Sequence, residues 1–166
     1  MALKAALVMG SDSDWPALKP VRKLLRELGV EVDVRVISAH RTPAAAHDFG
    51  SQAEANGVGV ILAAAGGAAH LAGVMASLTV LPVVGIPVKS KSLDGLDSLL
   101  STVQMPPGVP VATVGINAAE NAALLAAQIL SIGDPALRER LREHKRNLAE
   151  KVARADQELS RELDEE

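Results

Sequence analysis

A long charge-free segment in the middle of the chain most constrains what it can fold into. Residues 55–88 contain no Asp, Glu, Lys or Arg. Glycines, prolines and one histidine interrupt this segment, so it lacks the stretch of about 20 continuous apolar residues that a membrane-spanning helix needs. A continuous absence of charge is instead typical of strands that are buried on both faces of a parallel sheet. We therefore predict an α/β fold and no membrane partner.

Apolar runs that fit strands alternate five times with segments that carry apolar residues at helical spacing. The expected strands are residues 4–10, 31–37, 58–64, 82–86 and 109–114. The expected helices are residues 16–28, residues 43–56, a segment that ends near residue 78, one within 92–105, and residues 118–130. This alternation predicts a doubly wound fold, and five strands favour the order 2-1-3-4-5. The second strand alternates valines with charges, which places it near the edge of the sheet.

Prolines, glycines and one threonine set the expected ends of the helices. Pro20 lies near the start of the first helix, where we expect it to kink or delay the first turn. Gly29 is expected to end that helix. Thr42 followed by Pro43 predicts an N-cap and the first position of the next helix.

Charge is concentrated at the C-terminal end of the chain. Residues 134–166 hold 8 basic and 10 acidic residues, and they follow a Gly-Asp-Pro sequence that predicts a break. We predict one long polar helix over 135–163. It would extend from a domain of residues 1–133 and pack on a neighbouring subunit. The many alanines also favour an oligomer, because small side chains bury little area and contact between subunits would add to the core.

Composition excludes several classes of function. The chain has no cysteine, so disulfides, thiolate metal sites and cysteine nucleophiles are ruled out. One Trp, one Phe and no Tyr cannot form the stacking platforms of a single-strand nucleic-acid binder, and a net charge of −3 does not favour nucleic acid. No His, Asp and Glu cluster has metal-site spacing. The short apolar start, followed at once by acidic residues, does not fit a signal peptide, so we expect a cytoplasmic protein.

Polar residues gather after each of the first three predicted strands. These loops are residues 11–14, 38–41 and 66–70. The strand order 2-1-3 makes them neighbours at the carboxyl edge of the sheet, where doubly wound folds bind ligands. We therefore predict a ligand site at this edge. The remaining histidines, His47 and His144, fit solvated surface positions.

Each loop has a functional interpretation and a purely structural one. Residues 11–14 could bind a phosphate or ribose hydroxyls at a helix start, or could simply cap that helix. Arg41 could hold a phosphate or carboxylate while His40 moves protons; alternatively, Arg41 forms a surface ion pair and His40 packs. The two glycines of the third loop would let the backbone approach a ligand. His70 is either a second proton carrier or a half-buried structural histidine.

Six sequence blocks occur in a fixed order along the chain. They are MGSDSDW (9–15), SAHRTP (38–43), AAAGGAAHLAG (63–73), PVVGIPV (82–88), LDGLDSLLSTVQMPPGVPVATV (93–114) and NAALLAAQIL (121–130). These blocks resemble the N5-carboxyaminoimidazole ribonucleotide mutases of purine biosynthesis, class I of the PurE family. The resemblance covers about residues 3–133. It implies a three-layer α/β/α flavodoxin-like fold with a five-stranded parallel sheet, and usually a homo-octamer.

The resemblance also implies a reaction and roles for individual residues. The family converts N5-carboxyaminoimidazole ribonucleotide to 4-carboxy-5-aminoimidazole ribonucleotide without metal, ATP or biotin. Carbon dioxide would be released and held in a closed pocket until the ring recaptures it, and His40 would be the general acid/base. The implied ligands are Ser11, Ser13 and Asp14 for the nucleotide, Ser38 and Arg41 for phosphate or carboxylate, and Gly66, Gly67, His70 and Leu71 as walls around the imidazole and carbon dioxide.

Three alternatives stay open. A second branch of the family is an aminoimidazole ribonucleotide carboxylase that uses carbon dioxide directly; it carries a lysine where this chain has Arg41, which favours the mutase. A flavin- or nucleotide-binding module would want stacking aromatics, and only Trp15 lies near a site loop. A purely structural, oligomer-forming domain would explain the many alanines but not three polar loops at one edge.

Overall fold

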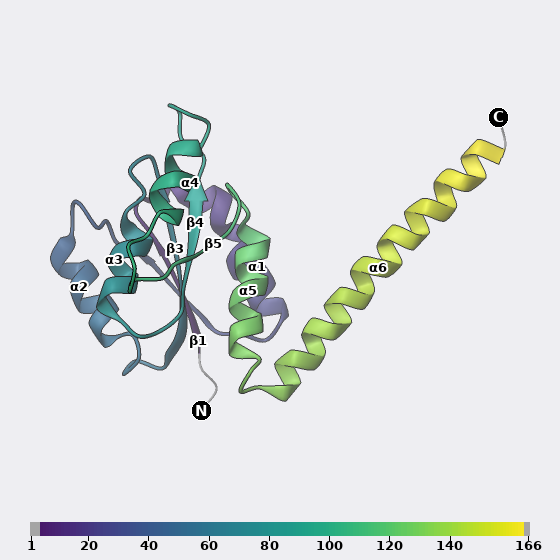
Figure 1. The fold of residues 1–166 in the computed structure, drawn as a ribbon. Helices are drawn as coiled ribbons and strands as arrows, with labels where there is room; N and C mark the ends of the chain where they lie inside the picture. Colours follow the sequence, from purple (N-terminus) through teal and green to yellow (C-terminus); the bar gives the residue numbers. More distant parts are fainter. Residues whose placement is uncertain (1–3, 165–166) are drawn as a thin grey trace.

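A five-stranded parallel sheet forms the centre of the computed structural model, which describes residues 4–164 (Figure 1). The strands are β1 (Lys4–Met9), β2 (Val32–Val36), β3 (Val58–Gly66), β4 (Val83–Val88) and β5 (Ala112–Thr113). Their order is β2-β1-β3-β4-β5, and every neighbouring pair is parallel. The predicted fold class and strand order are confirmed. Residues 1–3 and 165–166, the outer ends of the predicted domain and extension, lie outside the described residues.

Helices cover both faces of the sheet. They are η1 (Asp12–Asp14), α1 (Trp15–Glu27), α2 (Pro43–Gln52), α3 (Leu71–Leu78), α4 (Leu96–Val103), α5 (Ala119–Leu130) and α6 (Pro135–Asp164). Helices α1 and α5 share one core cluster with the sheet, and α2 and α3 share the other, which gives three layers. Helix α4 packs beside β4. None of the helices between residues 4 and 164 has both the length and the apolar character needed to cross a membrane.

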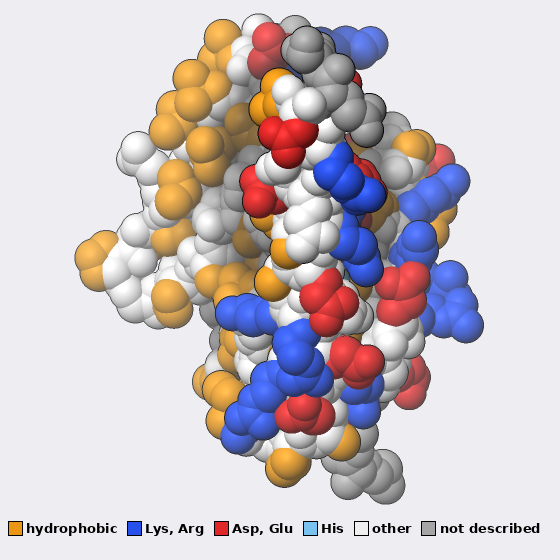
Figure 2. All heavy atoms as spheres, turned by 90° about the vertical axis from the view of Figure 1, so that its right-hand side faces the viewer, with side chains coloured by type: hydrophobic (Ala, Val, Ile, Leu, Met, Phe, Trp, Pro, Cys, Tyr) orange, Lys and Arg blue, Asp and Glu red, His pale blue; other side chains and the backbone are white. Residues whose placement is uncertain are grey.

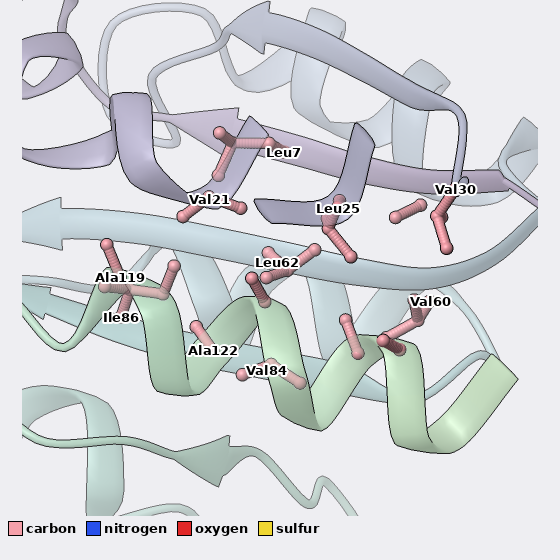
Figure 3. Close-up of a cluster of buried hydrophobic side chains, with 14 of the residues drawn as sticks. Leu7, Val21, Leu25, Val30, Val60, Leu62, Val84, Ile86, Ala119 and Ala122 are labelled. Carbon is pink, nitrogen blue, oxygen red and sulfur yellow. The ribbon is translucent and has the colours of Figure 1, made fainter. Parts of the chain in front are cut away.

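Burial on two sides explains the charge-free segment. In β3, Val60 and Leu62 belong to the core under α1 and α5, whereas Ile61 and Ala63 belong to the core under α2 and α3. All four side chains are at most 1% exposed. Figure 3 shows the first of these cores, in which Leu62 lies among apolar side chains from the helices and strands. A charge on either side of β3 would be cut off from water, so the strand tolerates none.

The signals at the ends of α1 had different outcomes. Gly29 follows the helix with φ 73°, as expected of a glycine that ends a helix. The expectation that Pro20 delays the first turn was wrong, because α1 begins at Trp15 and continues through the proline. A proline at this depth removes only the hydrogen bond to the carbonyl of Pro16. Pro16 is itself exposed to water, so the loss is tolerated.

Helix α6 begins at the predicted break. The carboxylate of Asp134 accepts a hydrogen bond from the amide of Leu137 at 3.0 Å. Leu137 and Leu141 are buried in the core of the domain, and the Arg140 side chain donates to the carbonyl of Leu28 at 2.7 Å. The rest of α6 extends away from the sheet (Figure 1). Figure 2 views this side of the molecule and shows acidic and basic side chains interspersed over it.

Replacement of Gly85 in β4 tests the packing of the sheet against α4. A Cβ atom at this position would lie 2.9 Å from Cγ1 of Val111 and would also overlap the methyl group of Thr102. Both neighbours are β-branched and stiff. We expect Gly85→Ala to lower the free energy of unfolding by about 1–3 kcal/mol in urea denaturation. Gly133→Ala is the control, since a Cβ there has no atom within 4 Å; equal stability of the two variants would contradict this packing.

Candidate active site

The three predicted loops line one cavity at the carboxyl ends of β1, β2 and β3. Its volume is about 380 Å³. The lining residues are Gly10, Ser11, Ser13, Asp14, Ser38, Ala39, His40, Arg41, Ala65, Gly66, Ala68, His70 and Leu71. All of the site residues expected from the sequence are in this lining except Gly67. Four lining residues were not expected, namely Gly10, Ala39, Ala65 and Ala68, and each is a small residue beside an expected one.

The first loop combines a helix cap with a partly buried carboxyl group. The Ser11 hydroxyl accepts hydrogen bonds from the Ser13 amide at 3.3 Å and from the Ser13 hydroxyl at 2.9 Å. Ser11 is therefore an N-cap, but of the short helix η1 and not of α1, and the same serine also lines the cavity. The Asp14 side chain caps no helix. Burial raises the pKa of its carboxyl, although hydrogen bonds from Ser13 and the Ser11 backbone act in the opposite direction.

In the second loop, the guanidinium group of Arg41 forms hydrogen bonds with uncharged partners. The Arg41 side chain donates to the carbonyl of Gly10 at 2.8 Å and to the Ser38 hydroxyl at 3.4 Å. Within residues 4–164, no carboxylate lies within the 4.0 Å of an ion pair with Arg41. The surface ion pair considered from the sequence is therefore not formed. The positive charge stays uncompensated at the edge of the cavity, where it can attract an anionic group of a ligand.

Thr42 shapes this loop in a way that the sequence did not reveal. It occupies the N-cap position of α2, but its side chain makes no capping hydrogen bond. The hydroxyl instead accepts from the Ser38 amide at 3.0 Å and donates to the Ser38 carbonyl at 2.9 Å. This pair of hydrogen bonds closes the loop and turns His40 and Arg41 toward the cavity.

The two candidate proton carriers are in direct contact. Nε2 of His40 and Nδ1 of His70 are 2.9 Å apart, and the rings meet edge to face with an interplanar angle of 82°. One nitrogen must donate and the other accept, so the pair shares a single proton along this edge. Both side chains are exposed, which contradicts the half-buried interpretation of His70. The contact joins residues from different loops, and no local sequence signal indicated it.

The third loop supplies a wall of small residues. Gly66 and Ala68 line the cavity, and Gly67 has φ 64°, a backbone conformation that favours glycine. The amide of Gly67 points away from the cavity and donates to the Ser98 hydroxyl of α4 at 2.8 Å. Gly67 therefore fixes the path of the loop instead of forming part of the lining.

Together these features fit a small phosphorylated or carboxylated ligand. One uncompensated cation, a partly buried carboxyl, several hydroxyls and a histidine pair converge on a cavity with small walls. Among residues 4–164, no three His, Cys, Asp or Glu side chains come together in the manner of a metal site. A doubly wound sheet with such a cavity at its switch point defines an α/β protein that binds a small anionic ligand.

Comparisons with known proteins assign the family. The AIR carboxylase family model matches residues 4–151. The N5-carboxyaminoimidazole ribonucleotide mutase of Pyrococcus abyssi is 56% identical over 145 residues, which are 87% of this chain and 83% of the relative. The crystal structure of Treponema denticola PurE has a TM-score of 0.85 and 28% identity, and the match covers 93% of this chain and 97% of that chain. The chain therefore belongs to the N5-carboxyaminoimidazole ribonucleotide mutase family of enzymes.

A carboxylase is also among the similar proteins. The chloroplastic phosphoribosylaminoimidazole carboxylase of Vigna aconitifolia is 50% identical over 154 residues. The match covers 93% of this chain but only 28% of that relative, so this chain spans about a quarter of its length. The resemblance identified from the sequence blocks is thus confirmed at the level of the family.

The raised pKa of Asp14 predicts that this residue lowers stability at neutral pH. Above the raised pKa the folded protein holds a partly buried, ionised carboxylate, whose charge is better solvated in the unfolded chain. We expect Asp14→Asn to raise the Tm at pH 7. This gain should shrink as the pH falls through the raised pKa toward 3.8, because the wild-type carboxyl then becomes neutral.

Thermal unfolding of both proteins between pH 7 and pH 4 measures this difference. Asp12→Asn is the matched control, since Asp12 is an exposed neighbour in the same turn. A gain in Tm for Asp14→Asn that is independent of pH would contradict the explanation by burial.

Proposed function

We propose that this chain interconverts N5-carboxyaminoimidazole ribonucleotide and 4-carboxy-5-aminoimidazole ribonucleotide in purine biosynthesis. The supporting observation is the cavity in which Arg41, Asp14 and His40 converge from different loops. The 56% identity to a mutase of this name supports the same reaction. The cation and hydroxyls suit the phosphate and ribose of a nucleotide, and the small walls suit a compact ring and carbon dioxide.

The proposed binding roles follow the three loops. Ser11, Ser13 and Asp14 hold the ribose and phosphate at the start of the first helical turn. Ser38 and Arg41 hold a phosphate or carboxylate, and the guanidinium remains available because its present partners include no carboxylate. The third loop surrounds the imidazole ring and carbon dioxide with Gly66, His70 and Leu71, while Gly67 shapes that loop from behind.

His40 is proposed to act first as an acid and then as a base. The bond between the carbamate nitrogen and its carboxyl carbon breaks, the electron pair stays on nitrogen, and His40 supplies a proton there. Ring carbon four of the resulting aminoimidazole then attacks the released carbon dioxide and forms a carbon–carbon bond. His40 removes the proton from that ring carbon, so the atoms and the protons balance over one cycle. The contact with His70 holds the His40 ring in place.

The small cavity serves this mechanism because carbon dioxide must not escape between the two halves of the reaction. Loss of carbon dioxide would leave aminoimidazole ribonucleotide and make the enzyme a decarboxylase. Walls of glycine and alanine allow the cavity to close tightly around a small molecule and exclude water.

The second candidate is an aminoimidazole ribonucleotide carboxylase that takes carbon dioxide from solution. The similarity to the Vigna aconitifolia carboxylase supports it, whereas Arg41 favours the mutase. A substrate-choice assay distinguishes the two. Purified protein receives either N5-carboxyaminoimidazole ribonucleotide or aminoimidazole ribonucleotide with bicarbonate, and ultraviolet absorbance follows the 4-carboxy product. Rapid product from the first substrate alone supports the mutase, and product from the second at physiological carbon dioxide supports the carboxylase.

Replacement of His40 tests the assignment of the acid/base. His40→Asn should lower kcat by at least about 100-fold, since the side chain that carries the proton is lost, while the affinity for the nucleotide changes little. His47→Asn is the control, because His47 is exposed on α2 and does not line the cavity. Steady-state kinetics and a binding titration measure both quantities. Wild-type turnover in the His40 variant would rule out its role.

We also propose that the chain works in the cytoplasm as a homo-octamer and that residues 134–166 form an extension packed on a neighbouring subunit. An apolar stripe on α6 supports this packing. Leu148, Val152, Leu159 and Leu163 continue the stripe of the buried Leu137 and Leu141, yet they are 50%, 70%, 55% and 61% exposed. Full burial of such a side chain is favourable by about 1.5–3 kcal/mol, and covering the exposed part of each would contribute roughly half of that.

A charge placed on the stripe tests this assembly. Leu159→Lys should convert the octamer to smaller species in size-exclusion chromatography with light scattering, because a lysine would replace an apolar contact. Gln157→Lys is the control. It adds the same charge two positions away, about 200° around the helix, where the stripe is absent. An octamer that withstands Leu159→Lys and Leu148→Lys together would argue against packing through this stripe.

A further inference from the structure

Two serines of α4 hold the third loop of the site from behind. The Ser98 hydroxyl accepts a hydrogen bond from the Gly67 amide at 2.8 Å. The Ser101 hydroxyl accepts from the Ala69 amide at 3.0 Å. Its single proton is shared between the carbonyl of Asp97, at 2.7 Å, and that of Gly67, at 3.1 Å. The two serines lie three positions apart and therefore on the same face of the helix. Neither of them lines the cavity.

These contacts bind the backbone of a segment whose own amides otherwise donate only over short range, from Ala69 to the Gly67 carbonyl and from His70 to the Ala68 carbonyl. Gly66, the last residue of β3, lines the cavity together with Ala68 and His70 of the segment that leads to α3. Gly67 and Ala69 alternate with them, and their amides bond to α4. Gly67 has a positive φ, and its amide and carbonyl both bond to α4 side chains. The serines thus select one conformation of a loop that its glycines alone would leave free.

The burial of Ser98 argues that this contact matters. Its side chain is fully buried, and the oxygen meets the Gly67 amide at 2.8 Å. A hydroxyl in such a place is unfavourable unless it is hydrogen-bonded, and removal of it would leave the amide of the half-buried Gly67 without this partner. The side chain therefore couples the position of α4 to the path of the loop.

We propose that Ser98 and Ser101 are positioning residues of the active site. They hold the loop so that Gly66 and Ala68 close one wall of the cavity and His70 reaches His40. This proposal rests on the proposed function, in which that wall retains carbon dioxide between its release and its recapture. When the serine contacts are lost, the wall loosens and carbon dioxide escapes more often, so more aminoimidazole ribonucleotide is formed per molecule of 4-carboxy product.

The ratio of these two products distinguishes positioning from a general loss of stability. A merely structural defect lowers the amount of active enzyme but leaves the ratio unchanged. We expect Ser98→Ala and Ser101→Ala to lower kcat about tenfold, and to raise the fraction of substrate released as aminoimidazole ribonucleotide several-fold. Ser101→Thr keeps the hydroxyl and should restore the wild-type ratio.

Thr102→Val is the matched control. Thr102 is a buried hydroxyl residue on the same helix, 2% exposed, but its oxygen donates only to the Ser98 carbonyl at 2.7 Å and does not contact the loop. This variant should lose stability and keep the wild-type product ratio. Well-folded serine variants with wild-type kcat and product ratio would overturn the proposal.

Amide hydrogen exchange keeps the test independent of the catalytic assignment. The amide of Gly67 should exchange slowly in the wild type and at least about tenfold faster in Ser98→Ala, because the Ser98 hydroxyl is its acceptor. The amide of Ala69 should exchange faster in Ser101→Ala by a smaller factor, because it keeps the Gly67 carbonyl as a second acceptor at 2.9 Å. Unchanged exchange would also overturn the proposal. The wild-type protein could also fail to convert either substrate while the serine variants still show fast exchange. That result would mean that the serines hold the loop but that the proposed function is wrong. If Ser98→Ala does not fold, the less buried Ser101→Ala and its threonine variant give the same readouts.

Discussion

Burial of β3 on both faces is the constraint on which the rest of the structure depends. Alternate side chains of this strand enter two separate cores, and each core needs its own layer of helices. The helices must return the chain to the same end of the sheet before every strand, so the strands are parallel. Their carboxyl ends then lie together at one edge. The core therefore gathers the three loops of the site, although Leu71 is the one cavity-lining residue among the described residues that also belongs to the buried core.

The site itself contains groups that would be unfavourable elsewhere in the fold. Arg41 is held by neutral oxygens and not by a carboxylate, and Asp14 keeps a carboxyl where burial raises its pKa. If ion pairs within the protein already neutralised these charged groups, few of them would be free to bind a substrate. The apolar cores on both sides of the sheet supply the stability that such unsatisfied groups require.

The sequence predicted what depends on local pattern and on topology. Hydrophobic spacing located the five strands and helices α1 to α6 but not η1, which lies in residues expected to form a loop. The strand order placed residues from 11–14, 38–41 and 66–70 around one cavity. Prediction from the sequence failed where a polar side chain could form a hydrogen bond with more than one partner. Thr42 bonds within its loop instead of capping α2, and His40 meets His70 across 30 positions of sequence. Both outcomes depend on the relative placement of loops, which no periodicity encodes.

The proposed retention of carbon dioxide would make conflicting demands on the third loop. Its walls must be small, which favours glycine and alanine, but glycine gives a backbone the greatest freedom to move. Side chains of the loop itself cannot resolve this conflict, because any large enough to anchor it would fill the cavity. The anchor must therefore come from another element, on the far side of the loop. Helix α4 has this position, and the hydroxyls of Ser98 and Ser101 bond the backbone there without adding bulk to the cavity.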